Sequence, residues 1–330
     1  VSSWIKCYHP DIFAAALLNS MPMGFYQPAQ IVIDARKHGV IVKEVDINHS
    51  YWNNTLEEKV NEHGALRLGF RQVKGLKEED MELLTVSRSS SYTTINEVLN
   101  AGISITALEQ LADADAFRSI GMDRRQALWQ IAALKDNPAG IYKGQSAAMA
   151  AEAEITLPAM SLSEHVLQDY AATTLSIKAH PVSFVRNKLT ALHVIPAGDL
   201  VKRKDGDIIE VAGLVLVRQR PGTATGICFI TIEDETGIAN LVVFRHMFER
   251  FRKEILNSRL LKVKGKLQIE AGVIHVVVQS CNNFNKLLNG LSNPEEDSLL
   301  TKTGERQTTV QNKKFKVVQA EIFPDGRNFR

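Results

Sequence analysis

The spacing of apolar residues changes after about residue 195. Before it, they recur every three or four positions in several stretches, which is typical of helices packed on one face. Beyond it, up to about 283, they alternate with polar residues, as in strands with one buried face. The predicted strands are 208–219, 226–233, 237–244, 260–269 and 273–278. Helical spacing over 246–256 separates the third strand from the fourth.

Three strands, a helix and two strands form the order of a five-stranded OB-fold β-barrel. Turn residues support this prediction, since Asp234-Glu235-Thr236-Gly237 and Glu270-Ala271-Gly272 stand where two of the hairpins must reverse. We therefore expect a multidomain α+β protein, with a helical region first and the barrel after it.

Glycines and prolines divide the helical part. Helices are expected over about 12–19, 28–37, 78–88, 105–111, 123–134 and 162–175, and a short strand over 40–45. Leu66, Phe70 and Val73 also have helical spacing and predict one more helix. The expected domains are a helical region (1–60), a glycine-hinged helical region (61–135), a linker with a connector helix (136–194), the barrel (195–283) and a polar tail (284–330).

Charge and cysteine content narrow the class of protein. The 39 Lys and Arg nearly balance the 37 Asp and Glu, so contacts with nucleic acid must come from local clusters. Cys7, Cys228 and Cys281 form no Cys-x-x-Cys pair, which favours neither zinc nor disulfides and indicates a reducing cytoplasm. No apolar run is long enough to span a bilayer.

The first candidate contact with nucleic acid is the turn Val73-Lys74-Gly75-Leu76. In a helix-hairpin-helix, a glycine lets the backbone approach a phosphate, and the N–H groups of the next helix point at it. Lys74 would add a positive charge. An ordinary connection between helices with an exposed lysine explains the tetrapeptide equally well.

A second set of candidates lies in the barrel. Lys262, Lys264 and Lys266 alternate with apolar residues and should share one outer face, where they could follow a phosphate backbone. A solvated strand face that blocks edge pairing is at least as good an interpretation. The other candidates are Lys202, Arg203, Lys204, Arg218, Arg220 and Phe229. For Phe229, a place in the core is favoured over stacking on a base.

Catalytic patterns are missing from the sequence. Nucleotidyl transfer needs carboxylates that hold paired metal ions, and the cluster Glu233-Asp234-Glu235 is better explained as turn chemistry. The nine histidines form no His-Glu-x-x-His motif, and no phosphate-binding loop or Gly-x-Gly-x-x-Gly is present. A hydrolase with a serine nucleophile is not supported either.

Segments along nearly the whole chain resemble bacterial C-family DNA polymerases, which are relatives of the DNA polymerase III alpha subunit. Asp34-Ala35-Arg36-Lys37-His38-Gly39-Val40 and Val73-Lys74-Gly75-Leu76 look like parts of their fingers and helix-hairpin-helix regions. Val215-Leu216-Val217-Arg218-Gln219-Arg220-Pro221-Gly222-Thr223-Ala224 and the ending Gly326-Arg327-Asn328-Phe329-Arg330 are similar to the error-prone branch.

The resemblance implies a DNA-binding, C-terminal part of a damage-tolerant polymerase that acts in translesion synthesis and DNA repair. The palm domain, with its aspartates and Mg²⁺, would lie upstream of Val1, so this part should need no cofactor and be inactive alone. The implied partners are primer-template DNA with its single-stranded template, accessory mutagenesis proteins and, indirectly, the sliding clamp, because no clear clamp-binding peptide is seen. No membrane partner is implied.

Two other functions stay open on the sequence. One is a stand-alone nucleic-acid-binding module without a polymerase parent. The other is an aminoacyl-tRNA synthetase that uses the barrel to bind an anticodon, although the helical first part does not resemble a synthetase body. Binding to tRNA compared with binding to primed DNA would separate these.

Overall fold

The computed structural model describes residues 1–23, 27–135, 157–223, 226–292, 322–323 and 326–329. It divides into two compact units, residues 1–161 with 168–177, and residues 162–167 with 178–330. The first part of the predicted linker (136–156) and most of the predicted tail (293–321) lie outside the described residues. No helix in the described ranges is long and apolar enough to cross a membrane.

The first unit packs helices around a small sheet. Its elements are α1 (Ser2–Tyr8), α2 (Pro10–Asn19), α3 (Pro28–Lys37), β1 (Val42–Lys43), β2 (Thr55–Val60), β3 (His63–Arg67), η1 (Phe70–Gln72), α4 (Glu78–Ser87), α5 (Ile95–Asn100), α6 (Ile105–Asp113), η2 (Arg118–Ile120) and α7 (Arg124–Lys135). Side chains from helices α2 to α7 and from β3 form one continuous core. Helix α8 (Leu162–Thr173) spans the division between the units.

One predicted helix of this unit is wrong. Leu66 lies on β3, the central strand of the order β1-β3-β2, whereas Phe70 lies in the short 3₁₀ turn η1 that follows. Their four-residue spacing therefore joins two different elements. Both side chains are fully buried, so the pattern reports burial correctly and the element type incorrectly.

Side-chain caps begin two of the helices in this unit, α6 and α7. Ser104 accepts a hydrogen bond from the Ala107 N–H and begins α6. Asp123 and Gln126 bond reciprocally, each side chain accepting from the other residue's backbone N–H, and this capping box begins α7. Such pairs fix the starts of helices that are too short to be stable without packing.

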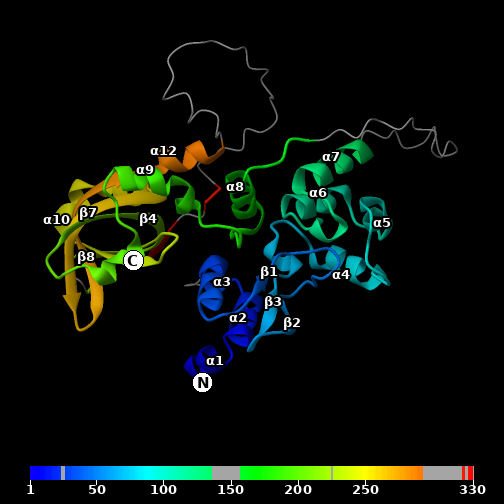
Figure 1. Cartoon of the computed structure of the whole chain (residues 1–330), viewed down its shortest axis with the longest axis horizontal. Coiled ribbons are helices and arrows are strands. Elements are labelled where there is room, and N and C mark those ends of the chain that lie inside the picture. The colour runs from blue at the N-terminus through cyan, green and yellow to red at the C-terminus, as the bar shows by residue number, and fades with distance from the viewer. Residues whose placement is uncertain (24–26, 136–156, 224–225, 293–321, 324–325, 330) are drawn as a thin grey trace, which may run out of the picture. The chain divides into compact units, whose positions relative to one another are not determined.

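The second unit is built on the predicted five-stranded barrel (Figure 1). Its elements are η3 (Pro181–Val185), α9 (Arg186–Ala191), η4 (Ala197–Lys202), β4 (Ile208–Gln219), β5 (Cys228–Glu233), β6 (Ile238–Val243), α10 (Arg245–Arg250), α11 (Arg252–Asn257), β7 (Leu260–Glu270), β8 (Val273–Asn283), α12 (Asn285–Asn289), η5 (Gly290–Ser292) and β9 (Arg327–Phe329). The strand order β5-β6-β8-β7-β4 closes because β4 also pairs with β5. The OB-fold prediction is confirmed.

Two features were not predicted here. The expected helix over 246–256 is two short helices, α10 and α11, that share the break at Phe251. In addition, β9 from the end of the chain pairs in parallel with the last residues of β4. Beyond Leu214, where its pairing with β7 ends, β4 has an open edge, and β9 covers it at 217–219.

Glycine at position 213 is required by the closure of the barrel. It lies on β4 one position before Leu214, which pairs with Glu233 of β5. A Cβ at Gly213 would stand 2.6 Å from the carbonyl oxygen of Glu233 and 2.9 Å from the backbone nitrogen of Glu233. Backbone atoms cannot yield as a flexible side chain could. A bulge with a similar glycine, Gly265, bends β7 against β8.

We therefore expect Gly213→Ala to lower the free energy of unfolding by about 1–3 kcal/mol, since it overpacks a strand crossing. Urea denaturation of the purified chain measures the change. Gly237→Ala is the matched control, because no atom lies within 4 Å of its added Cβ. Equal stability of the two variants would contradict the role given to Gly213.

Candidate nucleic-acid interface

The outer face of the barrel carries an unbroken row of side chains. The pairings link Phe229 of β5 to Val242 of β6, Val242 to Val277 of β8, and Val277 to Lys266 of β7. Paired residues share one face of a sheet, so an aromatic ring begins the row, two valines continue it and an ammonium group ends it. A second row places Thr231, Asn240 and His275 beside the first.

Phe229 is on this outer face and not in the core. Its neighbours Cys228 and Ile230 are buried, whereas Phe229 is 38% exposed. The expectation that favoured the core for Phe229 is therefore wrong. Over 228–232, apolar residues occupy the even-numbered positions and also position 229. The alternation alone therefore does not show which set of side chains faces the core.

A loop brings two cations, Arg203 and Lys204, and two carboxylates, Asp205 and Asp207, to the lysine end of the row. The Gly206 N–H donates to the Leu267 carbonyl, and the Leu267 N–H donates to the Asp207 carbonyl, so loop 203–207 lies against β7. Arg203 and Lys204 are exposed there, as is Lys202, whose ammonium bonds to Asp199 at 2.7 Å. The fold thus brings two clusters that are 60 residues apart in sequence to the same end of the sheet.

Two of the predicted contacts are occupied within the protein. The Lys262 ammonium lies 2.6 Å from a Glu210 carboxylate oxygen and 5.6 Å from the Phe284 ring, while Lys264 and Lys266 are exposed. Arg218 is 5% exposed, and its guanidinium donates to the carbonyls of Ile255, Ser258 and Gly326. The prediction that Arg218 contacts DNA is corrected accordingly, because its side chain is buried among backbone acceptors.

Arg220 lies apart from the outer row. Its guanidinium stands 4.7 Å from the centre of the Phe248 ring, on helix α10. The ring and the guanidinium attract each other electrostatically, which holds the arginine near the end of β4. Arg218 and Arg220 therefore belong to a different part of the barrel from the lysines.

The turn at Lys74 in the first unit is built as a glycine hinge. Gly75 has a φ of +84°, a conformation that side chains disfavour, and α4 begins three residues later. However, the Lys74 ammonium donates to the Ala171 carbonyl at 2.7 Å, near the carboxyl end of α8, and burial lowers its pKa. The first turn of α4 also carries Glu78, Glu79 and Asp80, which would repel a phosphate.

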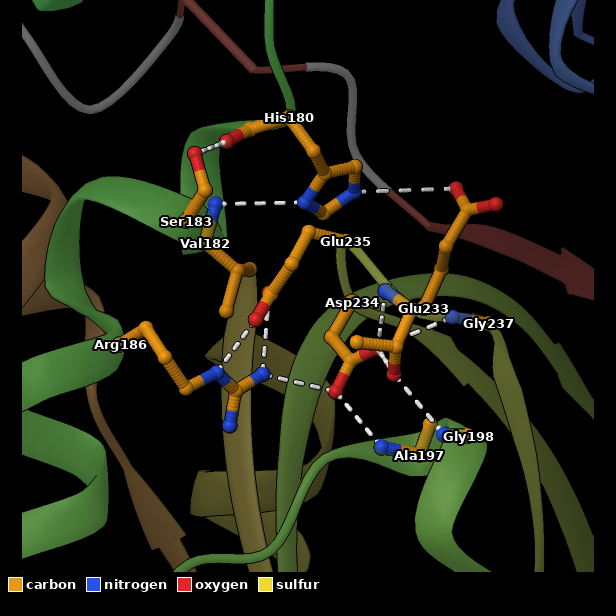
Figure 2. Close-up of polar contacts among 11 residues, drawn as sticks. His180, Val182, Ser183, Arg186, Ala197, Gly198, Glu233, Asp234, Glu235 and Gly237 are labelled. Carbon is orange, nitrogen blue, oxygen red and sulfur yellow. Dashed lines mark hydrogen bonds and ion pairs between the residues drawn. The ribbon is translucent and has the colours of Figure 1, made fainter.

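The acidic cluster Glu233-Asp234-Glu235 lies at the end of β5 (Figure 2). It stabilises the turn that follows β5 and binds the segment that precedes the barrel. One Asp234 oxygen accepts from the N–H groups of Thr236 and Gly237, as turn chemistry predicts. The other accepts from the Ala197 N–H and from Arg186 at 2.7 Å, and Arg186 also bonds to Glu235. These carboxylates therefore fix α9 and η4 to the barrel.

His180 completes this network. Its Nδ1 accepts from the Val182 N–H at 3.2 Å, which places the proton of the neutral ring on Nε2, 3.9 Å from a Glu233 oxygen (Figure 2). Burial lowers the pKa of His180 to about 4, and Arg186 acts in the same direction, against the opposing effect of Glu235 and Asp234. The ring is neutral in the folded protein. Within the described residues, no three His, Cys, Asp or Glu are placed to hold a metal ion.

Because the pKa of histidine is about 6.5 in an unfolded chain and about 4 in this fold, protonation favours unfolding. Stability contributed by neutral His180 is complete above pH 6.5 and is lost as the pH falls toward 4, by up to about 1.4 kcal/mol per pH unit. We expect His180→Gln to flatten this dependence in urea unfolding measured at pH 7, 6 and 5. His246→Gln, at an exposed position, should leave the slope as it is.

Comparisons with known proteins agree with this architecture. Residues 39–127 match a family model described as a helix-hairpin-helix motif, and residues 209–283 match one described as an OB-fold nucleic acid binding domain. Among solved structures, asparaginyl-tRNA synthetase from Pyrococcus horikoshii is 24% identical over 28% of this chain and 22% of its own, with a TM-score of 0.24. A likeness this limited has no bearing on function.

The fold and the two family models define a class of protein in which a helix-hairpin-helix region precedes an OB-fold nucleic-acid-binding domain. Relatives of the whole chain give a more specific comparison. Error-prone DNA polymerase from Sinorhizobium medicae is 42% identical over 99% of this chain, and the one from Brucella abortus is 45% identical over 91%. The chain is a homologue of error-prone DNA polymerases. It spans about a third of the length of these relatives, 34% and 28%.

Proposed function

We propose that this chain is the DNA-binding part of an error-prone, damage-tolerant DNA polymerase, and that its barrel holds the single-stranded template next to a primer-template junction. The observation that supports this best is the outer row from Phe229 to Lys266. The row lies on the second and third strands of the barrel, where OB-folds commonly bind single strands, and it continues onto the last two strands. An aromatic ring for a base, followed by cations for phosphates, suits any base sequence.

The distance along the row fits this proposal. Strands lie about 4.8 Å apart, so three strand spacings separate Phe229 from Lys266 by about 14 Å along the sheet. A strand of two or three nucleotides covers that span when its bases are unstacked. The valines between offer an apolar floor, and Asn240, beside them, offers an amide to the edge of a base.

The whole protein would use this part to position DNA while its palm, with Mg²⁺, joins nucleotides during translesion synthesis and repair in the cytoplasm. Recruitment would depend on accessory mutagenesis proteins and, through them, on the sliding clamp. The support for these statements is the homology to error-prone DNA polymerases. Nucleotide incorporation by this chain alone would contradict the assignment of catalysis to another part.

We expect Phe229→Ala to weaken binding to a primer-template with a single-stranded overhang by about 5- to 150-fold, because one stacked base contributes roughly 1–3 kcal/mol. Fluorescence anisotropy measures the affinity, with blunt duplex DNA as the second ligand. Tyr8→Ala removes an aromatic ring exposed in the other unit and should have little effect. An unchanged affinity of Phe229→Ala for the overhang would refute the stacking role.

The lysines are tested through salt dependence. Replacing both Lys264 and Lys266 with Gln should reduce the slope of log affinity against log salt by up to about two, one for each lost phosphate contact. The control pair is Lys253→Gln with Lys286→Gln, exposed on α11 and α12. Equal slopes for the two double variants would show that only net charge matters.

A further inference from the structure

The second row of side chains on the outer face of the barrel differs in chemistry from the first. Thr231 of β5 pairs with Asn240 of β6, Asn240 with His275 of β8, and His275 with Gln268 of β7. The two rows cross the same strands and lie two residues, about 7 Å, apart along each strand. Every member of the second row carries a hydrogen-bonding group, whereas valines form the middle of the first.

Asn240 is an unusual residue for its position. It lies inside β6, where it pairs with β5 on one side and with β8 on the other, so its amide is not needed for a helix cap or a turn. Its neighbours Ala239 and Leu241 are each 1% exposed, whereas Asn240 is exposed on the outer face. Asparagine is depleted in strands, and a β-branched residue such as the nearby Val242 would suit the sheet better. A role toward a ligand accounts for the amide.

The Thr231 hydroxyl fixes the direction of that amide. It donates to the side-chain oxygen of Asn240 at 3.3 Å. The oxygen is therefore turned toward β5, and the amide nitrogen, with its two hydrogens, is turned away from Thr231. Within the part of the chain that the structure describes, this nitrogen has no hydrogen-bond partner. The free end of Asn240 is thus a hydrogen-bond donor and not an acceptor.

The other two members of the row do not have this property. The Nδ1 atom of His275 is buried without a partner, so a ligand on the outer face does not reach it. Gln268 is exposed, and no described residue bonds to its amide. An amide that can turn offers either its oxygen or its nitrogen, so it does not distinguish donors from acceptors. Asn240 is the amide of this row that has a fixed direction.

A base that stacks on Phe229 has its edge near Asn240. The two residues are diagonal neighbours on adjacent strands, because Phe229 pairs with Val242 and Asn240 lies two positions before Val242. Diagonal neighbours in an antiparallel pair are roughly 7–8 Å apart, within reach of aromatic and long side chains. A flat base over the Phe229 ring extends across that gap. The amide nitrogen of Asn240 is therefore available to the hydrogen-bonding edge of the base.

We propose that Asn240 selects bases that carry an exocyclic carbonyl oxygen, and that Thr231 is the positioning residue for this selection. Thymine and guanine present such an oxygen, O4 or O6, where cytosine and adenine present an amino group. The Asn240 donor pairs with the oxygen, whereas it faces another donor at the amino group. The inference rests on the proposed function, because it requires a single strand on the outer row. It adds a base preference to contacts that otherwise suit any sequence.

The test compares DNA strands of deoxyuridine and of deoxycytidine. The two bases have rings of the same size and differ in the group at position 4 and in the protonation of the adjacent nitrogen. Fluorescence anisotropy measures the affinity of the whole chain for strands of about ten nucleotides, within the roughly 4–16 that one OB-fold covers. We expect binding to the deoxyuridine strand to be about 2- to 12-fold tighter, the range for one added hydrogen bond. Equal affinities, or tighter binding of deoxycytidine, overturn the proposal.

Variants test the two residues separately through the ratio of the two affinities. Asn240→Leu should abolish the preference, and Asn240→Asp should reverse it, since a carboxylate accepts from the amino group of cytosine. Thr231→Val keeps the shape of the side chain but releases the amide, so the ratio should fall toward one. The matched control is Gln268→Leu, which removes an amide of the same row and should leave the ratio within twofold of the parent value. A ratio that survives Asn240→Leu, or that Gln268→Leu lowers equally, overturns the assignment.

Failure of the base preference is distinguishable from failure of the proposed function. Phe229→Ala should weaken binding of both strands, since the ring stacks on either base. If the parent chain binds both strands equally and Phe229→Ala weakens both, the outer row is retained and the base preference is overturned. If the parent chain binds neither strand, both proposals are overturned.

Discussion

Everything in the second unit depends on the double pairing of β4. Its first half pairs with β7 and its second half with β5, so the sheet closes on itself and each outward side chain acquires neighbours on both sides. Closure needs backbones that cross closely, and Gly213 allows it. Without that closure, β5 would be an edge strand of an open sheet, and Phe229 would lie at an unpaired edge instead of on a closed barrel.

The segment before the barrel is fixed by buried charge. Arg186 reaches Asp234 and Glu235, and the Ala197 N–H donates to the same Asp234 oxygen as Arg186, while the other oxygen accepts from Thr236 and Gly237. A buried ion pair is stabilising only when its remaining hydrogen-bonding capacity is satisfied, as it is for Asp234. The result is that η4 and the loop 203–207 after it are held at one end of the barrel. An acidic cluster that could suggest metal chemistry is structural instead.

The outer row is the surface of the barrel that suits nucleic acid. It is open, has an aromatic ring at one end, and should hold a strand through many weak contacts. Its position follows from the alternation along β5, since Cys228 and Phe229 are adjacent in sequence, Cys228 is buried and Phe229 is exposed.

The alternation of apolar residues was enough to predict the barrel. A strand with one buried face repeats every two residues, and five such segments with one helix between the third and the fourth allow few other folds. The pattern could not say which phase faces inward at 228–232, nor that Leu66 and Phe70 belong to two elements. It also could not show that Arg218 is buried, since carbonyl groups from residues 255, 258 and 326 surround it only after folding. The spacing of apolar residues is a local property that can be read from the sequence. The hydrogen-bond partners of a side chain come from distant segments, which meet only when the chain packs.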